Sequence, residues 1–373
     1  MDFLKSNDSL DNLTALTNKQ TQNLAVVYIL SLSFSIIGSI SVISVSLVKK
    51  KYFDDQVRPL VQLTLADFLA AALLFSTTVI ELLPAEGFLN AYVFCHYGMG
   101  LALSFYCVSF LLVMIYAYEV KLTVQGWRET SNPNLQNGTH CKIKREHLYL
   151  LYFLAWSVPV VAFIVNVITI LNSATEIIPN HLNEKFALGI NKMSVNEDYS
   201  FFCSRCIFLI HMPSDICEAH EDIWKRDLVM KILFFLYVFA VVTCSVVAYC
   251  KVNLWCRRYE EDGLFCLRGD GFNNRNIKDI YLTVKFIFLA FLICWTPAFI
   301  LIILSLANIS PTKLFALYII QAFTMSLQGF LDSIAYGWLR RNFRQVALGE
   351  RSPILLASNA RPFYDESLTL PRS

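Results

Sequence analysis

Long apolar stretches alternate with shorter polar segments along most of the chain. A helix needs about 20 mainly apolar residues to cross a hydrocarbon layer of ~30 Å. Seven stretches reach that length, and they lie near residues 24–48, 58–83, 92–120, 148–171, 228–250, 279–304 and 312–338. Lipid offers no partners for backbone N–H and C=O groups, so each stretch must satisfy them as a helix. The pattern predicts an all-α membrane protein, a seven-transmembrane helix bundle.

The polar segments divide the chain into three predicted parts. These are a tail at 1–23, the bundle at 24–338 with a long connection at 172–227, and a second tail at 339–373. Residues 340–344, with Phe343 among four basic or amide side chains, form a short amphipathic piece. Such a piece is typical of a helix that lies on the membrane surface. We therefore expect a short cytoplasmic amphipathic eighth helix after the last span.

The composition supports a lipid environment for most of the chain. Of its 373 residues, 56% are hydrophobic and only 16% are charged, and the mean hydropathy is +0.50. A soluble domain carries about 25% charged residues. The net charge of +2 gives no reason to expect nucleic acid as a partner. The bilayer is therefore the expected environment.

The distribution of Lys and Arg predicts the orientation. Basic residues are concentrated in the connections at 49–58, 121–145 and 251–278 and in the tail after residue 338. Cytoplasmic loops carry this excess, so we expect an extracellular N-terminus, a cytoplasmic C-terminus and residence in the plasma membrane. Two sequons in the outer tail, at Asn7 and Asn12, are then plausible glycosylation sites.

Four cysteines fall on the predicted outer side. Cys95 lies at the start of the third stretch, and Cys203, Cys206 and Cys217 lie in the connection at 172–227. An oxidising compartment favours disulfides, so we expect Cys95 to tie the third helix to this connection. The sequence leaves its partner among the three loop cysteines open. A metal site is the alternative, but no convincing set of zinc ligands is complete there.

The sixth stretch contains a proline in its middle. Pro297 removes a backbone donor and clashes with the carbonyl four residues earlier, which kinks a helix. Trp295 lies two residues before it and Phe291 one turn further back. We interpret this segment as a membrane-embedded hinge with a bulky aromatic marker. An ordinary proline kink facing lipid is the alternative.

Two acidic residues lie deep in apolar stretches, Asp67 in the second and Asp332 in the seventh. An ionisable group at that depth costs about 3 kcal/mol on insertion scales, so each requires a partner or a function.

These positions together resemble the motifs of rhodopsin-like G-protein-coupled receptors. Phe291, Cys294, Trp295 and Pro297 match FxxCWxP of the sixth helix. Leu63 and Asp67 match LxxxD of the second helix, Asp332 and Tyr336 resemble (N/D)PxxY of the seventh, and Trp156 matches the fourth-helix tryptophan. The resemblance implies a ligand-driven movement of the sixth helix that is transmitted to a cytoplasmic G protein.

The resemblance also implies a polar pocket below the hinge. It would be formed by Asp67, Ser109, Gln328 and Asp332. At roughly 7 Å and an effective dielectric constant near 20, two carboxylates repel by about 2–2.5 kcal/mol. A bound Na⁺, which the resemblance implies, or a shared proton would relieve that repulsion. The alternative is that both acids only hydrogen-bond neighbouring helices.

Several positions depart from the receptor pattern. The cytoplasmic switch would comprise Glu119, Val120, Tyr336 and Phe343, but Val120 replaces the arginine that meets the G protein. Ser333 replaces a proline, so the end of the seventh helix should be straighter. Ala102 replaces the aspartate of amine receptors, which argues against an amine ligand. The fourth helix also resembles those of cAMP-receptor-like receptors, and the whole chain resembles orphan receptor-like proteins more than any receptor of known ligand.

A ligand cavity is a weaker prediction for the outer half. Its candidate lining is Phe105, Tyr106, Glu81, His96 and Trp295, although such aromatic residues more often simply pack helices. We expect a receptor with an unknown extracellular ligand and no cofactor except the Na⁺ named above. A receptor-like scaffold or trafficking protein is the second reading. An enzyme or transporter is not expected, because all six histidines map to loops or helix ends and internal repeats are not evident.

Overall fold

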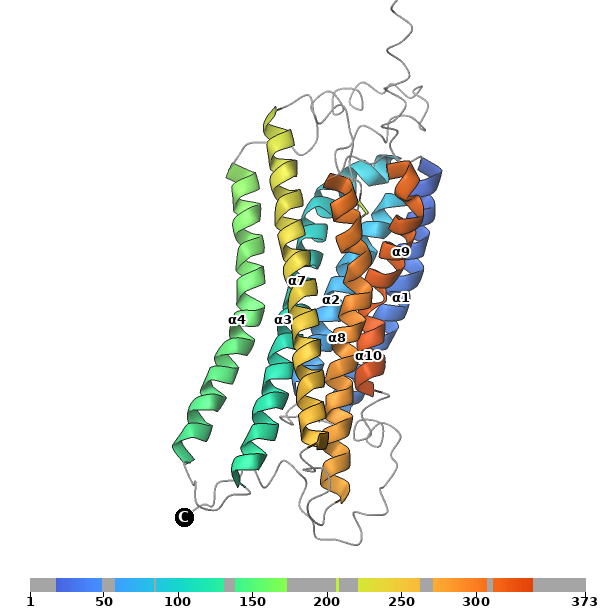
Figure 1. Ribbon diagram of the computed structural model, residues 1–373. Helices are drawn as coiled ribbons and strands as arrows, with labels where there is room; N and C mark the ends of the chain where they lie inside the picture. The colour runs from blue at the N-terminus through green and yellow to red at the C-terminus, as the bar shows by residue number, and fades with distance from the viewer. Residues whose placement is uncertain are drawn as a thin grey trace, which may run out of the picture.

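In the computed structural model, the described residues are 18–48, 58–83, 85–130, 138–172, 206–207, 221–261, 271–306 and 311–337. All regular structure in these ranges is helical. The long helices are α1 (Asn18–Val48), α2 (Arg58–Glu81), α3 (Ala85–Thr130), α4 (Gly138–Asn172), α7 (Glu221–Glu261) and α8 (Gly271–Leu306). The last part contains a 3₁₀ turn η4 (Pro311–Leu314), α9 (Phe315–Ser326) and α10 (Gln328–Gly337). The helices run side by side as one bundle (Figure 1).

The predicted all-helical architecture is confirmed, and the apolar stretches coincide with helices. Among the described residues, five helices are long and apolar enough to cross a membrane: those containing 19–48, 58–81, 97–120, 147–168 and 282–304. α7 and α9 contribute shorter apolar segments, Phe235–Lys251 and Phe315–Ser326. These helices make the chain a multi-pass membrane protein. The count of seven spans stays a prediction.

Several helices extend well beyond the apolar stretches that predicted them. α3 continues to Thr130 and α4 begins at Gly138, ten residues outside the apolar stretch in each case. Once a helix has formed, each added residue contributes a further backbone hydrogen bond. The length of an apolar stretch therefore predicts the part of a helix that lies in lipid, but it does not predict where the helix begins or ends.

On α4, at the edge of the bundle, large apolar side chains are exposed instead of buried. α4 packs on α3 and lies at the edge of the bundle (Figure 1). Its large apolar side chains are widely exposed, with Phe153 at 68% and Val165 at 56%. An exposed apolar surface of this kind suits contact with hydrocarbon chains.

Polar side chains within the apolar helices mostly bond to their own backbone. Ser46 donates to the carbonyl of Val42 at 2.8 Å, and Thr64 donates to that of Leu60 at 2.6 Å. Such bonds remove the cost of an unsatisfied hydroxyl in lipid. They leave a smaller set of polar groups that bond between helices, and these mark the candidate site.

The seventh stretch is divided into two helices. α9 ends at Ser326 and α10 begins at Gln328, with Leu327 between them. α10 then continues through Ser333, whose hydroxyl donates to the carbonyl of Gly329 at 2.6 Å. α10 thus runs through Ser333 without a break, and the straighter end stays a prediction. The discontinuity at Leu327 was not predicted.

Some predicted features lie outside the described residues. They are the tail with Asn7 and Asn12, Cys203 and Cys217, most of the connection at 172–227, and the segment 339–373 with Phe343 and the eighth helix. The side chains of His96 and Tyr336 also lie outside the described set, although both backbones are helical.

Candidate functional site: a polar centre beneath the Pro297 hinge

Four polar side chains from three helices meet in the middle of the bundle, and we call them the polar centre. They are Asp67 of α2, Ser109 of α3, and Gln328 and Asp332 of α10, and each is at most 1% exposed. Ser109 donates to Asp67 Oδ1 at 2.6 Å, and the Gln328 amide nitrogen approaches the same oxygen at 3.2 Å. Gln328 Nε2 also lies 3.3 Å from Ser109 Oγ. Residues 42 to 261 positions apart are thereby joined.

The two carboxyl groups of the polar centre are incompletely satisfied. Asp67 Oδ2 and both carboxyl oxygens of Asp332 have no hydrogen-bond partner among the described residues. The two groups are also close enough to interact directly. A carboxylate can only accept hydrogen bonds, and two buried negative charges in contact repel strongly. A proton between them or a cation beside them would satisfy these oxygens.

A tight helix approach closes the polar centre on the side of α1. A Cβ atom on Gly329 would lie 2.5 Å from Ser35 Oγ, 3.1 Å from Ser39 Oγ and 3.2 Å from the Cβ of Asp67. Only a glycine fits there without displacement of these atoms. Ser39 Oγ is buried without a hydrogen-bond partner in the described part of the chain. It adds one further polar atom at the edge of the centre.

Trp295 connects the polar centre to the proline-containing helix. Its indole Nε1–H donates to Gln328 Oε1 at 2.9 Å, and its side chain is fully buried. Gln328 therefore accepts through its oxygen from α8 and donates through its nitrogen towards Asp67, which fixes the amide orientation. The hydrogen bonds run from Trp295 through Gln328 to Asp67.

Two tyrosines hold the indole ring edge-on. The ring centroids of Tyr106 on α3 and Tyr237 on α7 lie 5.8 Å and 5.6 Å from that of Trp295, with interplanar angles of 84° and 83°. Edge-to-face pairs of this kind contribute about 0.5–1.5 kcal/mol each beyond burial. Tyr237 could not be predicted from the sequence, because one tyrosine in an apolar helix does not indicate which neighbour it contacts.

The helix around Pro297 is supported by two other helices. Phe291 packs on Phe110 of α3 with ring centroids 5.8 Å apart. Thr324 of α9 donates to the carbonyl of Cys294 at 3.4 Å, in the turn before the proline. α8 runs through Pro297 as one helix. A displacement of the segment before Pro297 would therefore change contacts with α3 and α9 together.

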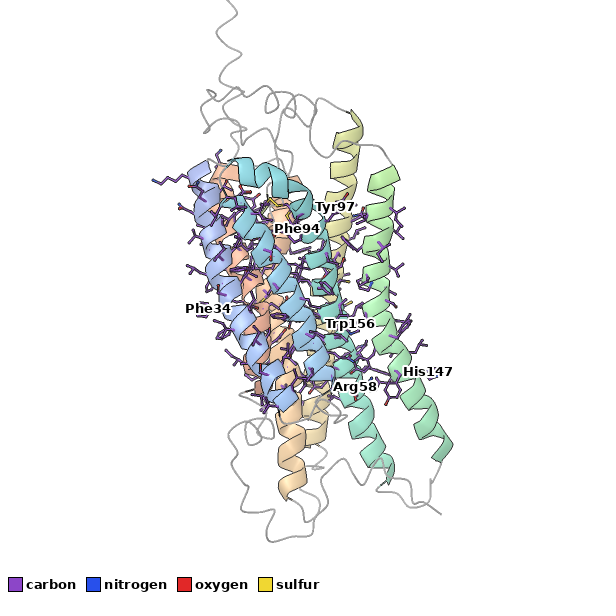
Figure 2. All side chains as sticks on the ribbon, turned by 180° about the vertical axis from the view of Figure 1, so that it is seen from behind. Phe34, Arg58, Phe94, Tyr97, His147 and Trp156 are labelled. Carbon is purple, nitrogen blue, oxygen red and sulfur yellow. A yellow bond between two sulfur atoms is a disulfide. The ribbon has the colours of Figure 1, made fainter. Side chains whose placement is uncertain are left out.

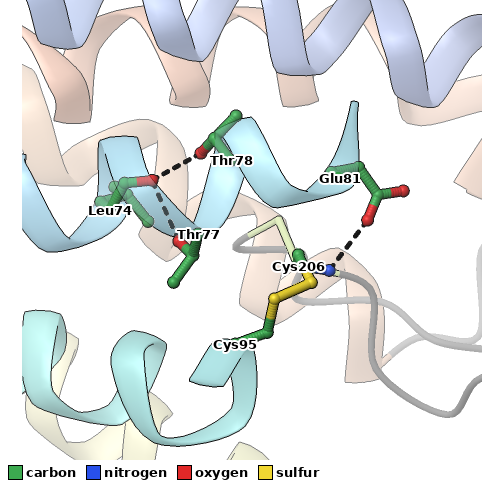
Figure 3. Close-up of a disulfide and its surroundings, with 6 residues drawn as sticks. All are labelled: Leu74, Thr77, Thr78, Glu81, Cys95 and Cys206. Atoms are coloured by element: carbon green, nitrogen blue, oxygen red, sulfur yellow. Dashed lines mark hydrogen bonds between the residues drawn. A yellow bond between two sulfur atoms is a disulfide. The ribbon is translucent and has the colours of Figure 1, made fainter. Parts of the chain in front are cut away.

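One disulfide joins the end of the bundle nearest the start of α3. Cys95 is bonded to Cys206, as Figure 3 shows, so the predicted staple is confirmed with Cys206 as the partner. Glu81 at the end of α2 accepts a hydrogen bond from the Cys206 backbone N–H at 3.0 Å. α2 and α3 thus hold the same short piece of chain.

The residues predicted to line a ligand pocket have separate partners. Phe105 packs edge-on against Trp156 of α4, with centroids 6.4 Å apart. Tyr106 packs on Trp295, and Glu81 binds the Cys206 N–H. These contacts favour the helix-packing interpretation of the aromatic residues.

At the opposite end of α3, Glu119 and Val120 occupy the predicted switch positions. Tyr152 of α4 donates to Glu119 Oε2 at 2.8 Å, and Val120 is buried at 8% exposure. Close by, Arg58 of α2 lies over the ring of Tyr149, with its Cζ 5.1 Å from the centroid (Figure 2). The acid therefore has a phenol as a hydrogen-bond partner, and the chain position after it carries an apolar side chain.

In the described part of the chain, no group of three or more His, Cys, Asp or Glu residues could hold a metal ion. The polar centre supplies two carboxylates and a hydroxyl, which are hard oxygen ligands. The Gln328 amide presents its nitrogen to the centre, because its oxygen accepts from Trp295.

Comparison with protein families gives a match over most of the chain. The model of the family described as Transmembrane protein 116 matches residues 22–353. This range contains every described helix except the first residues of α1. The chain therefore belongs to the Transmembrane protein 116 family.

Proposed function

We propose that this chain is a receptor-like signalling protein of seven spans, with its N-terminus outside the cell and its C-terminus in the cytoplasm. In this proposal an extracellular signal moves α8 about Pro297, and the movement alters the cytoplasmic face that a G protein would contact. The bundle arrangement and the excess of Lys and Arg on one side support it. No catalytic role is proposed.

The observation that carries the proposal is the hydrogen bond from Trp295 to Gln328. It connects the hinge helix to a buried carboxyl pair, which costs free energy unless a proton or cation is present. A shift of the indole would leave Gln328 Oε1 without its hydrogen-bond donor. The Gln328 amide would then be less well oriented for its hydrogen bond to Asp67. Two arrangements of these few side chains would give the two-state element that a receptor needs.

The polar centre would bias those two arrangements. We propose that it takes up Na⁺ or a single shared proton when the Trp295–Gln328 bond is intact. Three carboxyl oxygens without partners support an occupant there. Loss of the bond would then lower the affinity for that occupant, because binding and conformation are reciprocally coupled.

The test measures G-protein dissociation in cells, across the four Gα classes, at matched surface levels. Trp295→Phe keeps an aromatic ring but removes the N–H donor, and Trp156→Phe is the matched control on α4. A receptor gives basal or ligand-driven dissociation that Trp295→Phe changes and Trp156→Phe leaves at the wild-type level. An output unchanged by Trp295→Phe would contradict the role of this hydrogen bond.

A second function has its own support at the inner end of α3. Val120 is buried where a receptor has its arginine, and Glu119 is bonded to Tyr152. These contacts favour a receptor-like scaffold or trafficking protein that does not activate G proteins. Val120→Arg separates the two proposals. Coupling that appears only in Val120→Arg favours the scaffold, and coupling by the wild type favours the receptor.

A further inference from the structure

A lysine lies inside the apolar part of α8, on the side that faces α7. Lys285 falls four residues into a segment, Leu282–Leu304, that is apolar enough to span a membrane. Its ammonium lies 3.4 Å from Asn253 Oδ1 and 5.4 Å from the centroid of the Tyr249 ring. Among the described residues no carboxylate pairs with it. A positive charge near lipid without an acidic partner needs another counter-charge.

The facing side of α7 carries further donors. Tyr249, Asn253 and Arg257 follow each other at intervals of four residues, so they share one face of the helix. Asn253 uses its oxygen to accept from Lys285, and its NH₂ group has no described acceptor. Arg257 is exposed one turn further along. Two cations and one amide donor therefore converge on one strip, which we call the α7–α8 basic strip: Asn253, Arg257 and Lys285.

The depth of this strip matches the edge of the hydrocarbon layer. The apolar segment of α7 ends at Lys251, and that of α8 begins at Leu282. Asn253 and Lys285 bond across this level. The phosphate groups of a bilayer lie just outside its hydrocarbon core, so the strip lies at phosphate depth.

Exposed apolar side chains border the strip on its membrane side. Leu282, Phe286 and Leu289 of α8 are 39%, 43% and 39% exposed, and Leu254 of α7 is 55% exposed. The three residues of α8 recur at helical intervals and form one outward face next to Lys285. Acyl chains on these residues would place a headgroup beside the basic strip.

We propose that the α7–α8 basic strip binds the headgroup phosphate of an anionic phospholipid. Lys285 and Arg257 supply charge, and the Asn253 NH₂ supplies a directed hydrogen bond. The Tyr249 ring keeps the ammonium in place by a cation–π contact. The outward apolar residues hold the acyl chains. A soluble phosphate compound would find the same donors but would gain nothing from the apolar face, and so the lipid is the preferred occupant.

The test uses the full-length protein in nanodiscs of phosphatidylcholine with a minor fraction of phosphatidylserine. Lipids that stay with the protein after transfer to mild detergent are counted by native mass spectrometry. The variant Lys285→Gln/Arg257→Gln removes both charges. The matched control Lys19→Gln/Lys313→Gln removes two exposed lysines at the other end of the bundle.

Each basic residue near a membrane surface contributes about fivefold to the affinity for an anionic lipid. Because the double variant removes two such residues, it should retain phosphatidylserine about 25-fold less than the wild type. The control variant should equal the wild type, and retention of phosphatidylcholine should be the same in all three. The charge-preserving Lys285→Arg/Arg257→Lys should keep most of the binding. The intact Cys95–Cys206 disulfide and a single chromatographic peak verify that each variant is folded.

Three results would overturn the proposal. One is equal loss in the control and the double variant, and another is no preference of the wild type for phosphatidylserine over phosphatidylcholine. The third is displacement of the bound lipid by glycerophosphoserine at lipid-like concentrations, which would show that the apolar face does not contribute. None of these results depends on whether the chain couples to G proteins.

Discussion

The polar centre and the Glu119 region of α3 differ in how closely they follow the receptor pattern. Around Asp67, the hydroxyl, amide and indole partners predicted from the motifs converge in one network. Around Glu119, the arginine of the receptor pattern is absent, and Tyr152 of α4 donates a hydrogen bond to the Glu119 carboxylate. The Trp295–Gln328–Asp67 network can thus be present while the residues around Glu119 depart from the receptor pattern. The two regions can be altered separately, and the variants below do so.

The largest effect is expected where a side chain would break the packing of the polar centre. Gly329→Val would push a Cβ against Ser35 and Ser39 of α1 and against the Cβ of Asp67 on α2. Overpacking costs about 1–3 kcal/mol, and a branched side chain next to two rigid helices should lie at the upper end. Thermal unfolding in detergent and delivery to the cell surface would both measure it.

A second glycine provides the control for that substitution. A Cβ on Gly100 would meet only the Phe163 ring, at 3.3 Å, and that ring can shift on the exposed α4. Gly100→Ala should change the unfolding temperature little. Equal losses from both substitutions would mean that α10 does not approach α1 as closely as the structure shows.

The second effect concerns the paired acids. Asp332→Asn keeps the shape but removes one charge and adds a donor that can reach Asp67. Relief of a repulsion of about 2 kcal/mol should stabilise the protein at neutral pH without sodium. Wild-type protein should gain stability from added Na⁺ or from acid, because either satisfies the carboxyl oxygens. Asp332→Asn, and equally Asp67→Asn, should respond to neither.

Unfolding temperatures in sodium and in choline buffers at several pH values would test this. Asp67 has two hydrogen-bond donors and Asp332 has none among the described residues. Asp67→Asn should therefore be the less stable of the two variants. If wild type and both variants respond identically to sodium and acid, the polar centre has no ionic occupant and serves only to pack helices.

The third effect tests the inner end. Tyr152→Phe removes the donor to Glu119 and leaves its ring in place. A hydrogen bond to a charged group contributes about 1.5–3 kcal/mol to stability. Because Glu119 is partly exposed, we expect Tyr152→Phe to lower the free energy of unfolding by an amount near the lower limit. Because this contact joins α3 to α4, hydrogen exchange should rise in the adjoining turns of both helices. Exchange around Trp295 should be unchanged, and a rise there would show that the two regions are coupled.

The sequence predicted much of the polar centre because its residues belong to motifs with fixed spacing. Asp67 and Asp332 lie at motif positions, the resemblance adds Ser109 and Gln328, and the structure brings all four together. Tyr152 and Tyr237 were missed, since their contacts depend on how α4 and α7 rotate about their own axes. The break at Leu327 was missed for a similar reason. Leucine favours helices, and the local sequence gives no sign of the tertiary contacts that interrupt one there.

The smallest effect is expected at the disulfide, where two attachments hold the same piece of chain. Glu81→Gln keeps an acceptor for the Cys206 N–H but loses the charge. The loss should be only about 0.5–1 kcal/mol, because the Cys95–Cys206 bond still limits how far residue 206 can move. In Cys95→Ser the same substitution should matter more, since the hydrogen bond to Glu81 then remains to hold residue 206. A double-mutant cycle of unfolding temperatures would reveal this coupling. Simple additivity would show that Glu81 and the disulfide stabilise the end of the bundle independently.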